Sequence, residues 1–264
     1  MNVTAARLRA KRRYVALAIL SPAAIILVWT IAARDGGVAP TILPSPAAVV
    51  RSFVDMVQNG YSGVDLWTHV GASLARVGIA FVAGSVLGVG IGLLRGRVAA
   101  IDALLLVPSE IVRPIPPLGL IPLFILWFGI GELSKILLIF LSVFLIMMVN
   151  AQAGSRACGT DVLRAAQSMG AGRWQIFRFV VLPSALPQIM TGLRVSMGTA
   201  LTILVASELL GGDRGLGFII LDASSFFRTT YVFAGVVIIG LIGLASDRGI
   251  AYLARRMVHW EGRR

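Results

Sequence analysis

Apolar runs long enough to cross a lipid bilayer recur along this chain, and they constrain its fold more than any other feature. Residues 14–33 are twenty uncharged residues, and as a helix they would be about 30 Å long, the thickness of a membrane's hydrocarbon core. Of the 264 residues, 57% are hydrophobic and 14% are charged, which is atypical of soluble domains. We therefore predict an all-α integral membrane protein with about six transmembrane helices, formed by residues 14–33, 72–94, 98–130, 133–149, 189–210 and 231–253.

The first apolar run follows a basic cluster, with five Lys and Arg residues among positions 7–13. A secretory signal peptide has the same order of charge and apolar residues, but its apolar region is usually about 7–15 residues long and ends at a small-residue cleavage site. No such site closes this run cleanly. We favour a retained membrane anchor after a cytoplasmic N-terminus of residues 1–13, with a signal peptide as the alternative.

Glycines and prolines mark two of the other runs. Gly84, Gly88 and Gly92 lie four residues apart, and such a stripe lets helix backbones approach closely, so we expect this run to pack against another helix. The run 98–130 is too long for one straight crossing and has three prolines within residues 114–117. Because proline removes a backbone donor, we expect a break there, giving either one bent span or a crossing followed by a re-entrant helix.

The polar segment 34–71 contains a signal for the start of a helix. In its LPSP sequence, Ser45 can cap a helix and Pro46 suits the first helical position. We expect an amphipathic helix that lies on the membrane surface, with an ordinary helix packed on the protein as the alternative. Its predicted apolar face consists of Val49, Val50, Phe53, Val54 and Val57.

The distribution of positive charge predicts the orientation. Lys and Arg are concentrated in the N-terminal cluster, after the second run, around Arg164 and from Arg248 onward, all on one side of a six-span protein. By the positive-inside rule, both termini and the Arg164 loop are cytoplasmic and the segment 34–71 is periplasmic. The net charge of +12 does not point to nucleic acid, because the basic residues stand in short clusters beside apolar runs, with few aromatics among them.

Residues suited to catalysis or metal binding are scarce. Cys158 is the only cysteine, and His69 and His259 are far apart in the sequence. The sequence shows no paired nucleophile and base, no carboxylate dyad and no G-x-x-x-x-G-K-[ST] phosphate loop. We therefore expect no catalytic site, metal or cofactor in this chain, and an energy source in another subunit.

Five side chains within the apolar runs are candidates for a substrate pathway. Glu110 and Arg113 stand one turn apart before the prolines, where ionisable groups are costly and usually functional. Arg113 could meet an anionic substrate group there, or the two side chains could simply pair with each other. Thr199, Thr202 and Glu208 share a later run, where hydroxyl groups could line a pathway or bond back to carbonyls of their own helix.

A polar and basic island, RAAQSMGAGRWQIFRFVVLP at residues 164–183, lies between two apolar runs. We expect one short helix over residues 164–172, with small residues that leave room for another protein. The loop has an alanine pair, then Gly170 after three residues, then VVLP after nine more. This spacing resembles the EAA loop of ABC importer permeases, although Arg164 replaces the usual glutamate. The resemblance implies that the loop 156–185 docks on an ATPase subunit, through Arg164, Ala165, Ala166, Gly170, Ala171, Gly172, Leu182 and Pro183.

The resemblance covers nearly the whole chain. Three segments are similar to permeases of the taurine, aliphatic sulfonate and nitrate branch: LPSP at residues 43–46, RPIPPLGLIPLFILWFGIGELSKI at 113–136 and RGLGF at 214–218. The segment 113–136, together with RAAQS, is more similar to taurine permeases than to the others. This implies the type I importer fold in one transmembrane permease domain, residues 1–264, of a bacterial inner membrane. It also implies a second copy of this subunit, two ATPase subunits that bind ATP and Mg, and a periplasmic substrate-binding protein.

Three alternatives stay open from the sequence. Within the family, the substrate could be an alkanesulfonate or nitrate, since substrate choice can lie largely in the binding protein. An ion-coupled secondary transporter would use Glu110 and Glu208 as relay groups, but no internal repeat is evident and it would not need the Arg164 loop. A structural membrane subunit is the third class.

Overall fold

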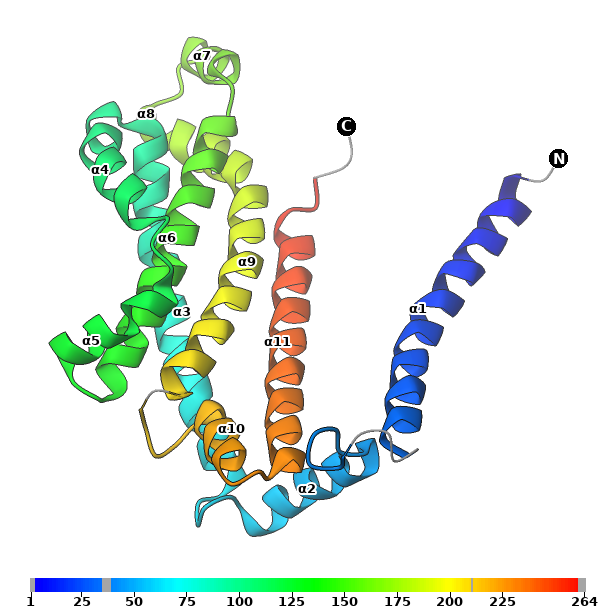
Figure 1. The fold of residues 1–264 in the computed structure, drawn as a ribbon. Helices are drawn as coiled ribbons and strands as arrows, with labels where there is room; N and C mark the ends of the chain where they lie inside the picture. Colours follow the sequence, from blue (N-terminus) through cyan, green and yellow to red (C-terminus); the bar gives the residue numbers. More distant parts are fainter. Residues whose placement is uncertain (1–2, 35–38, 210, 261–264) are drawn as a thin grey trace. The chain divides into compact units, whose positions relative to one another are not determined.

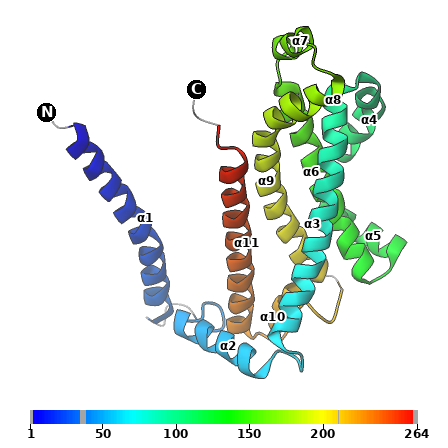
Figure 2. The same ribbon diagram turned by 180° about the vertical axis from the view of Figure 1, so that it is seen from behind.

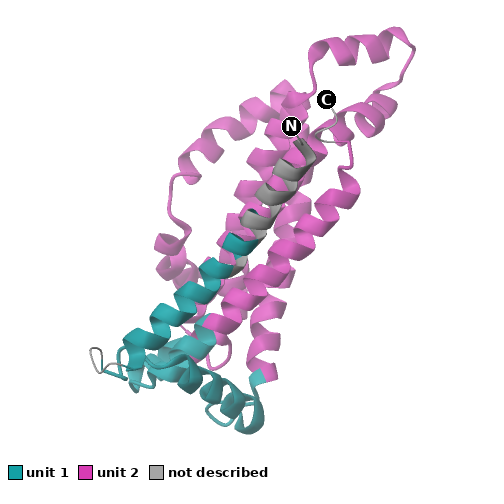
Figure 3. Cartoon of the chain, turned by 90° about the vertical axis from the view of Figure 1, so that its right-hand side faces the viewer, with its two compact units in different colours: residues 1–66, 220–236 teal, residues 67–219, 237–264 magenta. Residues whose placement is uncertain are grey.

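The computed structural model describes residues 3–34, 39–209 and 211–260. These residues form helices and connecting turns, with one isolated bridge between Tyr61 and Val64 and no strand among them. The chain divides into two compact units, residues 1–66 with 220–236 and residues 67–219 with 237–264 (Figure 3). The prediction of an all-α protein is confirmed.

Five helical stretches are long and apolar enough to cross a membrane, and a bent pair of helices makes up to six. Each stretch covers one of the predicted apolar runs, so the expected number of spans agrees with the structure. The long helices are α1 (Val3–Arg34), α3 (Leu66–Arg97), α6 (Glu132–Ala157), α9 (Leu182–Leu209) and α11 (Thr229–Met257) (Figure 1).

The bent pair lies at the predicted proline break. Helix α4 (Ala99–Val112) ends just before Arg113, and the short turn η1 (Pro117–Leu120) leads into α5 (Ile121–Phe128). The two arms are bent by 84° relative to each other. Prolines that lack N–H groups cannot continue the helical hydrogen bonds of α4, so the break occurs where the sequence predicts it. The bend is compatible with both a broken span and a re-entrant segment.

The glycines of α3 lie directly against α6. A Cβ atom added at Gly88 would be 2.7 Å from the Cβ of Met147 and 2.8 Å from the carbonyl oxygen of Phe144. Gly84 and Gly92 approach α6 in the same way. The predicted close packing is confirmed, and its partner is α6.

Helix α6 also packs against α9, so that α3, α6 and α9 run side by side (Figure 2). A Cβ at Gly192 of α9 would be 2.8 Å from the Cβ of Asn150, and one at Gly154 of α6 would be 2.9 Å from the carbonyl oxygen of Ala185. The core of this unit is apolar and centres on α6. Its most deeply buried side chains include Leu138, Ile139, Val143, Met147, Ile203 and Leu204.

The segment 34–71 contains the expected helix. Helix α2 (Pro46–Asn59) begins with Pro46 and is capped by Ser45, whose hydroxyl oxygen accepts the N–H of Ala48 at 3.3 Å. Its buried positions are Val49, Ser52 and Met56, which are spaced at three and four residues. Of the predicted apolar face only Val49 is buried and the neighbouring stripe stays exposed, so its contact with the membrane surface stays a prediction. That stripe includes Val50, Phe53 and Val54.

Two tyrosines fasten α2 and the adjoining turn to residues 220–236 of the same unit. The hydroxyl of Tyr61 donates to Asp222 at 2.8 Å, and that of Tyr231 donates to Asp55 at 2.6 Å. Burial and the bond to Asp222 raise the pKa of Tyr61, and the bonds from Tyr231 and Asn59 lower the pKa of Asp55. The phenol of Tyr61 therefore stays a protonated donor at neutral pH, and the carboxylate of Asp55 stays an ionised acceptor.

Candidate functional site

A cavity of about 380 Å³ lies beside the proline break. This volume falls within the usual range of small-molecule sites, about 300–1,000 Å³. Irregular backbone inside a membrane is tolerated where it lines such a cavity, and the break at residues 113–117 does so here. The break, α6 and α9 contribute the lining, which consists of Arg113, Ile115, Pro117, Ser142, Leu145, Ile146, Val149, Asn150, Val195 and Thr199.

The polar groups of the cavity can bind an anion. Arg113 is the one charged side chain among the lining residues, and it forms no ion pair with another residue of the described chain. Ser142, Asn150 and Thr199 each donate one hydrogen bond to a carbonyl of their own helix, at 3.0, 2.8 and 3.2 Å. The guanidinium group has five N–H donors, and Asn150 keeps a second amide hydrogen. An oxyanion could therefore find both charge and hydrogen bonds here.

The sequence candidates for the pathway divide into two groups. Arg113 and Thr199 line the cavity, whereas Glu110, Thr202 and Glu208 do not. Thr202 donates to the carbonyl of Gly198 at 3.1 Å, as the alternative interpretation of its hydroxyl predicts. The expected pair between Glu110 and Arg113 is absent, because the guanidinium lines the cavity while the carboxylate stays exposed on α4.

Glu208 belongs instead to a buried polar network, which we call the Glu208 network. Its carboxylate accepts the guanidinium of Arg76 at 2.5 Å, the hydroxyl of Ser73 at 2.8 Å and the N–H of Gly217 at 2.8 Å. The side chain has no exposed surface. These contacts occupy the carboxylate oxygens, so the structure corrects the expectation that Glu208 lines a pathway.

The same network fixes the RGLGF segment that follows α9. The hydroxyl of Ser73 also accepts the N–H of Leu216 at 2.9 Å, and His69 Nδ1 accepts the N–H of Gly215 at 3.2 Å. Arg76 donates to the carbonyl of Arg214 at 2.9 Å and makes two further bonds to Glu132, each 2.5 Å long. Sequence reasoning missed Arg76, although a lone arginine inside an apolar run was the signal that could have found it.

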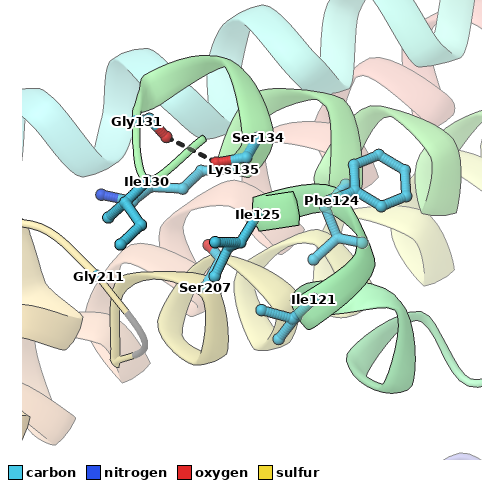
Figure 4. A pocket seen from close by; sticks show the side chains of 10 residues that line it. Ile121, Phe124, Ile125, Ile130, Gly131, Ser134, Lys135, Ser207 and Gly211 are labelled. Atoms are coloured by element: carbon cyan, nitrogen blue, oxygen red, sulfur yellow. Dashed lines mark hydrogen bonds between the residues drawn. The ribbon is translucent and has the colours of Figure 1, made fainter. Parts of the chain in front are cut away.

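A second cavity near this network is too small for a substrate. It has a volume of about 10 Å³, which is room for about one water molecule. Figure 4 shows its lining, formed by α5, the first turn of α6 and the end of α9, with Ser134 bonded to the carbonyl of Gly131 at 2.9 Å. A third cavity, of about 370 Å³, lies between α9 and the end of α11, away from the proline break, and we take the cavity beside Arg113 as the candidate substrate site.

The predicted coupling loop contains two short helices rather than one. Helix α7 spans Thr160–Ser168 and α8 spans Arg173–Ile176, so the expected single helix over 164–172 was wrong. The helix ends because Gly170 adopts a φ of +81° and donates to the carbonyl of Gln167 at 2.9 Å, while Ala171 donates to Ala166 at 3.1 Å. These two bonds make a Schellman motif, which needs the left-handed residue that glycine supplies.

Within this loop, the predicted residues differ in their exposure. Arg164, Ala165, Gly170 and Gly172 are exposed, whereas Ala166 is buried. Large apolar side chains are exposed beside them on the same segment, notably those of Val162, Met169 and Trp174. Leu182 and Pro183 are half-buried at the start of α9, after the wide turn η2 (Phe177–Val181). The loop thus presents a partly apolar surface, and Leu182 and Pro183 lie at its base.

Comparisons with known proteins agree with this architecture. Residues 82–259 match the family described as "Binding-protein-dependent transport system inner membrane component". The taurine transport system permease protein TauC of Escherichia coli is 39% identical over 95% of this chain and 91% of its own length. The putative aliphatic sulfonates permease SsuC of Bacillus subtilis is 36% identical over 92% and 87%, and the nitrate import permease NrtB of Synechocystis is 30% identical over 90% and 88%.

A solved structure shares the fold. In inward-facing conformations of the MetNI methionine ABC transporter, one chain superimposes with a TM-score of 0.64 at 21% identity, covering 73% of this chain and 97% of that one. This likeness supports the type I importer fold. The chain therefore belongs to the family of binding-protein-dependent transport system inner membrane components, as a permease subunit of an ABC importer of the taurine, aliphatic sulfonate and nitrate branch.

Proposed function

We propose that this subunit forms the translocation pathway for a small sulfonate, with taurine as the first candidate, and couples its import to ATP hydrolysis in a separate subunit. The observation that carries this proposal is the 39% identity to a taurine permease over 95% of the chain. The cavity beside Arg113 supports it, because a sulfonate is a compact anion whose oxygens can accept several guanidinium hydrogen bonds.

The pathway is proposed to pass the proline break. Arg113 would supply a positive charge to the sulfonate, and Thr199 and Asn150 would supply polar contacts in a lining that is otherwise mostly apolar. A transport site must release its substrate, so the absence of a carboxylate bonded to Arg113 suits transient binding rather than a permanent pair. Glu110, which does not line the cavity, would have no direct contact with the substrate there.

The loop 156–185 is proposed as the ATPase dock. The exposed side chains of Met169 and Trp174 would be costly to leave in water and are suited to a groove in another protein. Arg164, Ala165, Ala166, Gly170, Ala171 and Gly172 would form this surface, with Leu182 and Pro183 linking it to α9. The Schellman turn at Gly170 would give the dock a fixed shape.

The remaining arrangement follows from charge and family. Two copies of this subunit, two ATPase subunits holding ATP and Mg, and a periplasmic binding protein would make the transporter, with membrane lipid around it. The distribution of positive charge supports an orientation with both termini and the loop 156–185 in the cytoplasm of a bacterial cell and the segment 34–71 in the periplasm, where α2 would lie at the membrane surface. This chain would carry no catalytic site and no cofactor.

Reconstitution of the complete complex tests the proposal. ATP hydrolysis and uptake would be measured in proteoliposomes with the binding protein loaded with taurine, longer alkanesulfonates or nitrate. Stimulation by taurine above the other loads supports the assignment. Uptake without any ATP requirement would rule out the importer mechanism proposed here.

The second candidate substrates are longer alkanesulfonates and nitrate. The identities of 36% to a sulfonate permease and 30% to a nitrate permease favour them in that order. All three are anions that suit Arg113, so the same experiment separates them by the preferred load.

A further inference from the structure

The ends of three helices meet at one carboxylate, far along α4 from the cavity. Asp102, in the first turn of α4, accepts Arg95 of α3 at 3.2 Å. It also accepts the amide of Gln152 at 2.7 Å and the guanidinium of Arg156 at 2.5 Å, both from the last two turns of α6. We call this cluster the Asp102 junction.

Two arginines of α3 add further hydrogen bonds at the junction, one to α4 and one to the end of α6. Arg95 is buried and also donates to Ser109, 3.0 Å away, so it holds α4 at two points about two turns apart. Arg97 donates to the carbonyls of Ser155 and Cys158, the second at 3.5 Å. A cation at the C-terminus of a helix satisfies its free carbonyls, so Arg97 caps α6.

The junction lies between the proposed dock and the proposed substrate cavity. Helix α6 ends at Ala157 and α7 begins at Thr160, so only Cys158 and Gly159 separate the helix that carries Gln152 and Arg156 from the first helix of the dock. At its other end, α4 leads directly to Arg113. The eleven residues from Asp102 to Arg113 correspond to about 16 Å of helix.

We propose that Asp102 is a positioning residue that fixes the start of α4 to the end of α6, so that movement of the dock is passed along α4 to Arg113. The inference rests on the proposed function of the loop 156–185 and of the cavity. Asp102 is the only carboxylate that bridges α3, α4 and α6 at this end of the described chain. Without it, α4 would keep a single polar tie, from Ser109 to Arg95.

The first test substitutes Asp102→Asn in the complete complex. Asparagine keeps the shape but removes the charge that holds Arg95 and Arg156. We expect the ratio of substrate uptake to ATP hydrolysis, measured per assembled complex, to fall about 2- to 30-fold, the range of residues that carry coupling between sites. Complex yield should change less than this ratio, and Asp102→Glu should recover part of it. Asp213→Asn, which removes an exposed carboxylate, is the control and should leave the ratio unchanged.

A second test replaces the ionic tie by a covalent one. In a Cys158→Ser background, Asp102→Cys and Gln152→Cys would be joined by a short thiol cross-linker. We expect low coupling before cross-linking and recovery of the uptake ratio after it. An unchanged ratio in Asp102→Asn, or a cross-link that blocks transport, would overturn the proposal. If the wild-type complex itself shows no substrate-stimulated hydrolysis, the proposed function fails instead, independently of Asp102.

Discussion

The Glu208 network and the cavity beside Arg113 place the same kinds of side chain in apolar helices of one unit, but with opposite results. Glu208 is fully buried, and Arg76, Ser73 and Gly217 occupy its carboxylate oxygens. Arg113 faces open space and has no ion-pair partner within the described residues. A charged group in a membrane helix is therefore structural where protein partners satisfy all its hydrogen bonds, and it is available to a ligand where they do not.

The difference arises from the hydrogen-bond partners that face the Glu208 carboxylate and the Arg113 guanidinium. Three successive residues, Gly215, Leu216 and Gly217, bring their N–H groups to His69, Ser73 and Glu208 and so close the network from one side. At the cavity, none of the described carboxylates pairs with the Arg113 guanidinium, and this side chain lines open space instead. The completed hydrogen bonds of Glu208 hold the RGLGF segment in place, whereas the free N–H groups of Arg113 remain available to an anion.

The largest expected effect is the loss of the Glu208 carboxylate. Glu208→Ala leaves the N–H of Gly217 and one side of buried Arg76 without a partner, and breaking a buried pair typically costs about 3–5 kcal/mol. We expect a strong fall in complex yield and in the midpoint of thermal unfolding in detergent. The matched control is Glu110→Ala, since that carboxylate is exposed and unbonded; a similar loss of stability in both would contradict the distinction drawn here.

Arg113→Ala should have the opposite profile. Because the guanidinium has no ion-pair partner among the described residues, complex yield and thermal midpoint should stay close to wild type. Uptake should fall about tenfold or more, since a hydrogen bond to a charged group contributes about 1.5–3 kcal/mol. Uptake and yield would be measured on the same preparations. Parallel losses of yield and uptake would indicate that Arg113 has a structural role.

Sequence reasoning predicted the features that depend on local rules. The apolar runs, the cap at Ser45, the glycine stripe of α3 and the break at residues 114–117 each follow from the chemistry of a few adjacent residues. It also selected Arg113 and Thr199, which line one cavity. These two residues share a site because Arg113 stands at a proline break and Thr199 lies on a neighbouring helix. The proline break was visible in the sequence, but the proximity of the two helices was not.

The rest depended on contacts between distant residues. Glu208 and Arg113 look alike as lone charges in apolar runs, and only the position of Arg76 and of the RGLGF backbone separates them. The Asp102 junction joins residues about fifty positions apart, so no local pattern predicted it. The single helix expected over 164–172 failed because Gly170 was interpreted as a small surface residue rather than as a helix terminator.

A smaller effect is expected at the glycines that close the Glu208 network. A Cβ at Gly217 would lie 2.6 Å from that of Glu208 and 2.7 Å from the carbonyl oxygen of Val205, so Gly217→Ala should shift the backbone. Overpacking of this kind costs about 1–3 kcal/mol. The thermal midpoint should fall, whereas Gly90→Ala should leave it nearly unchanged, because beyond the local backbone of α3 no described atom lies within 4 Å of a Cβ added there. Equal midpoints for the two variants would mean that the network tolerates displacement of its backbone.

The smallest expected effect separates two threonines of the same helix. Thr199 and Thr202 both donate to a carbonyl four residues earlier, at 3.2 and 3.1 Å, so replacing either by valine removes the same kind of helix contact. Only Thr199 also lines the cavity, where its oxygen can accept a further hydrogen bond, for example from the amino group of taurine. One neutral hydrogen bond contributes about 0.5–1.5 kcal/mol, so Thr199→Val should weaken the apparent affinity of the complex for its loaded binding protein or substrate by about two- to tenfold. Thr202→Val should match wild type in the same titration of uptake, and an equal change in both variants would show that the shared helix contact, rather than the cavity, determines the effect.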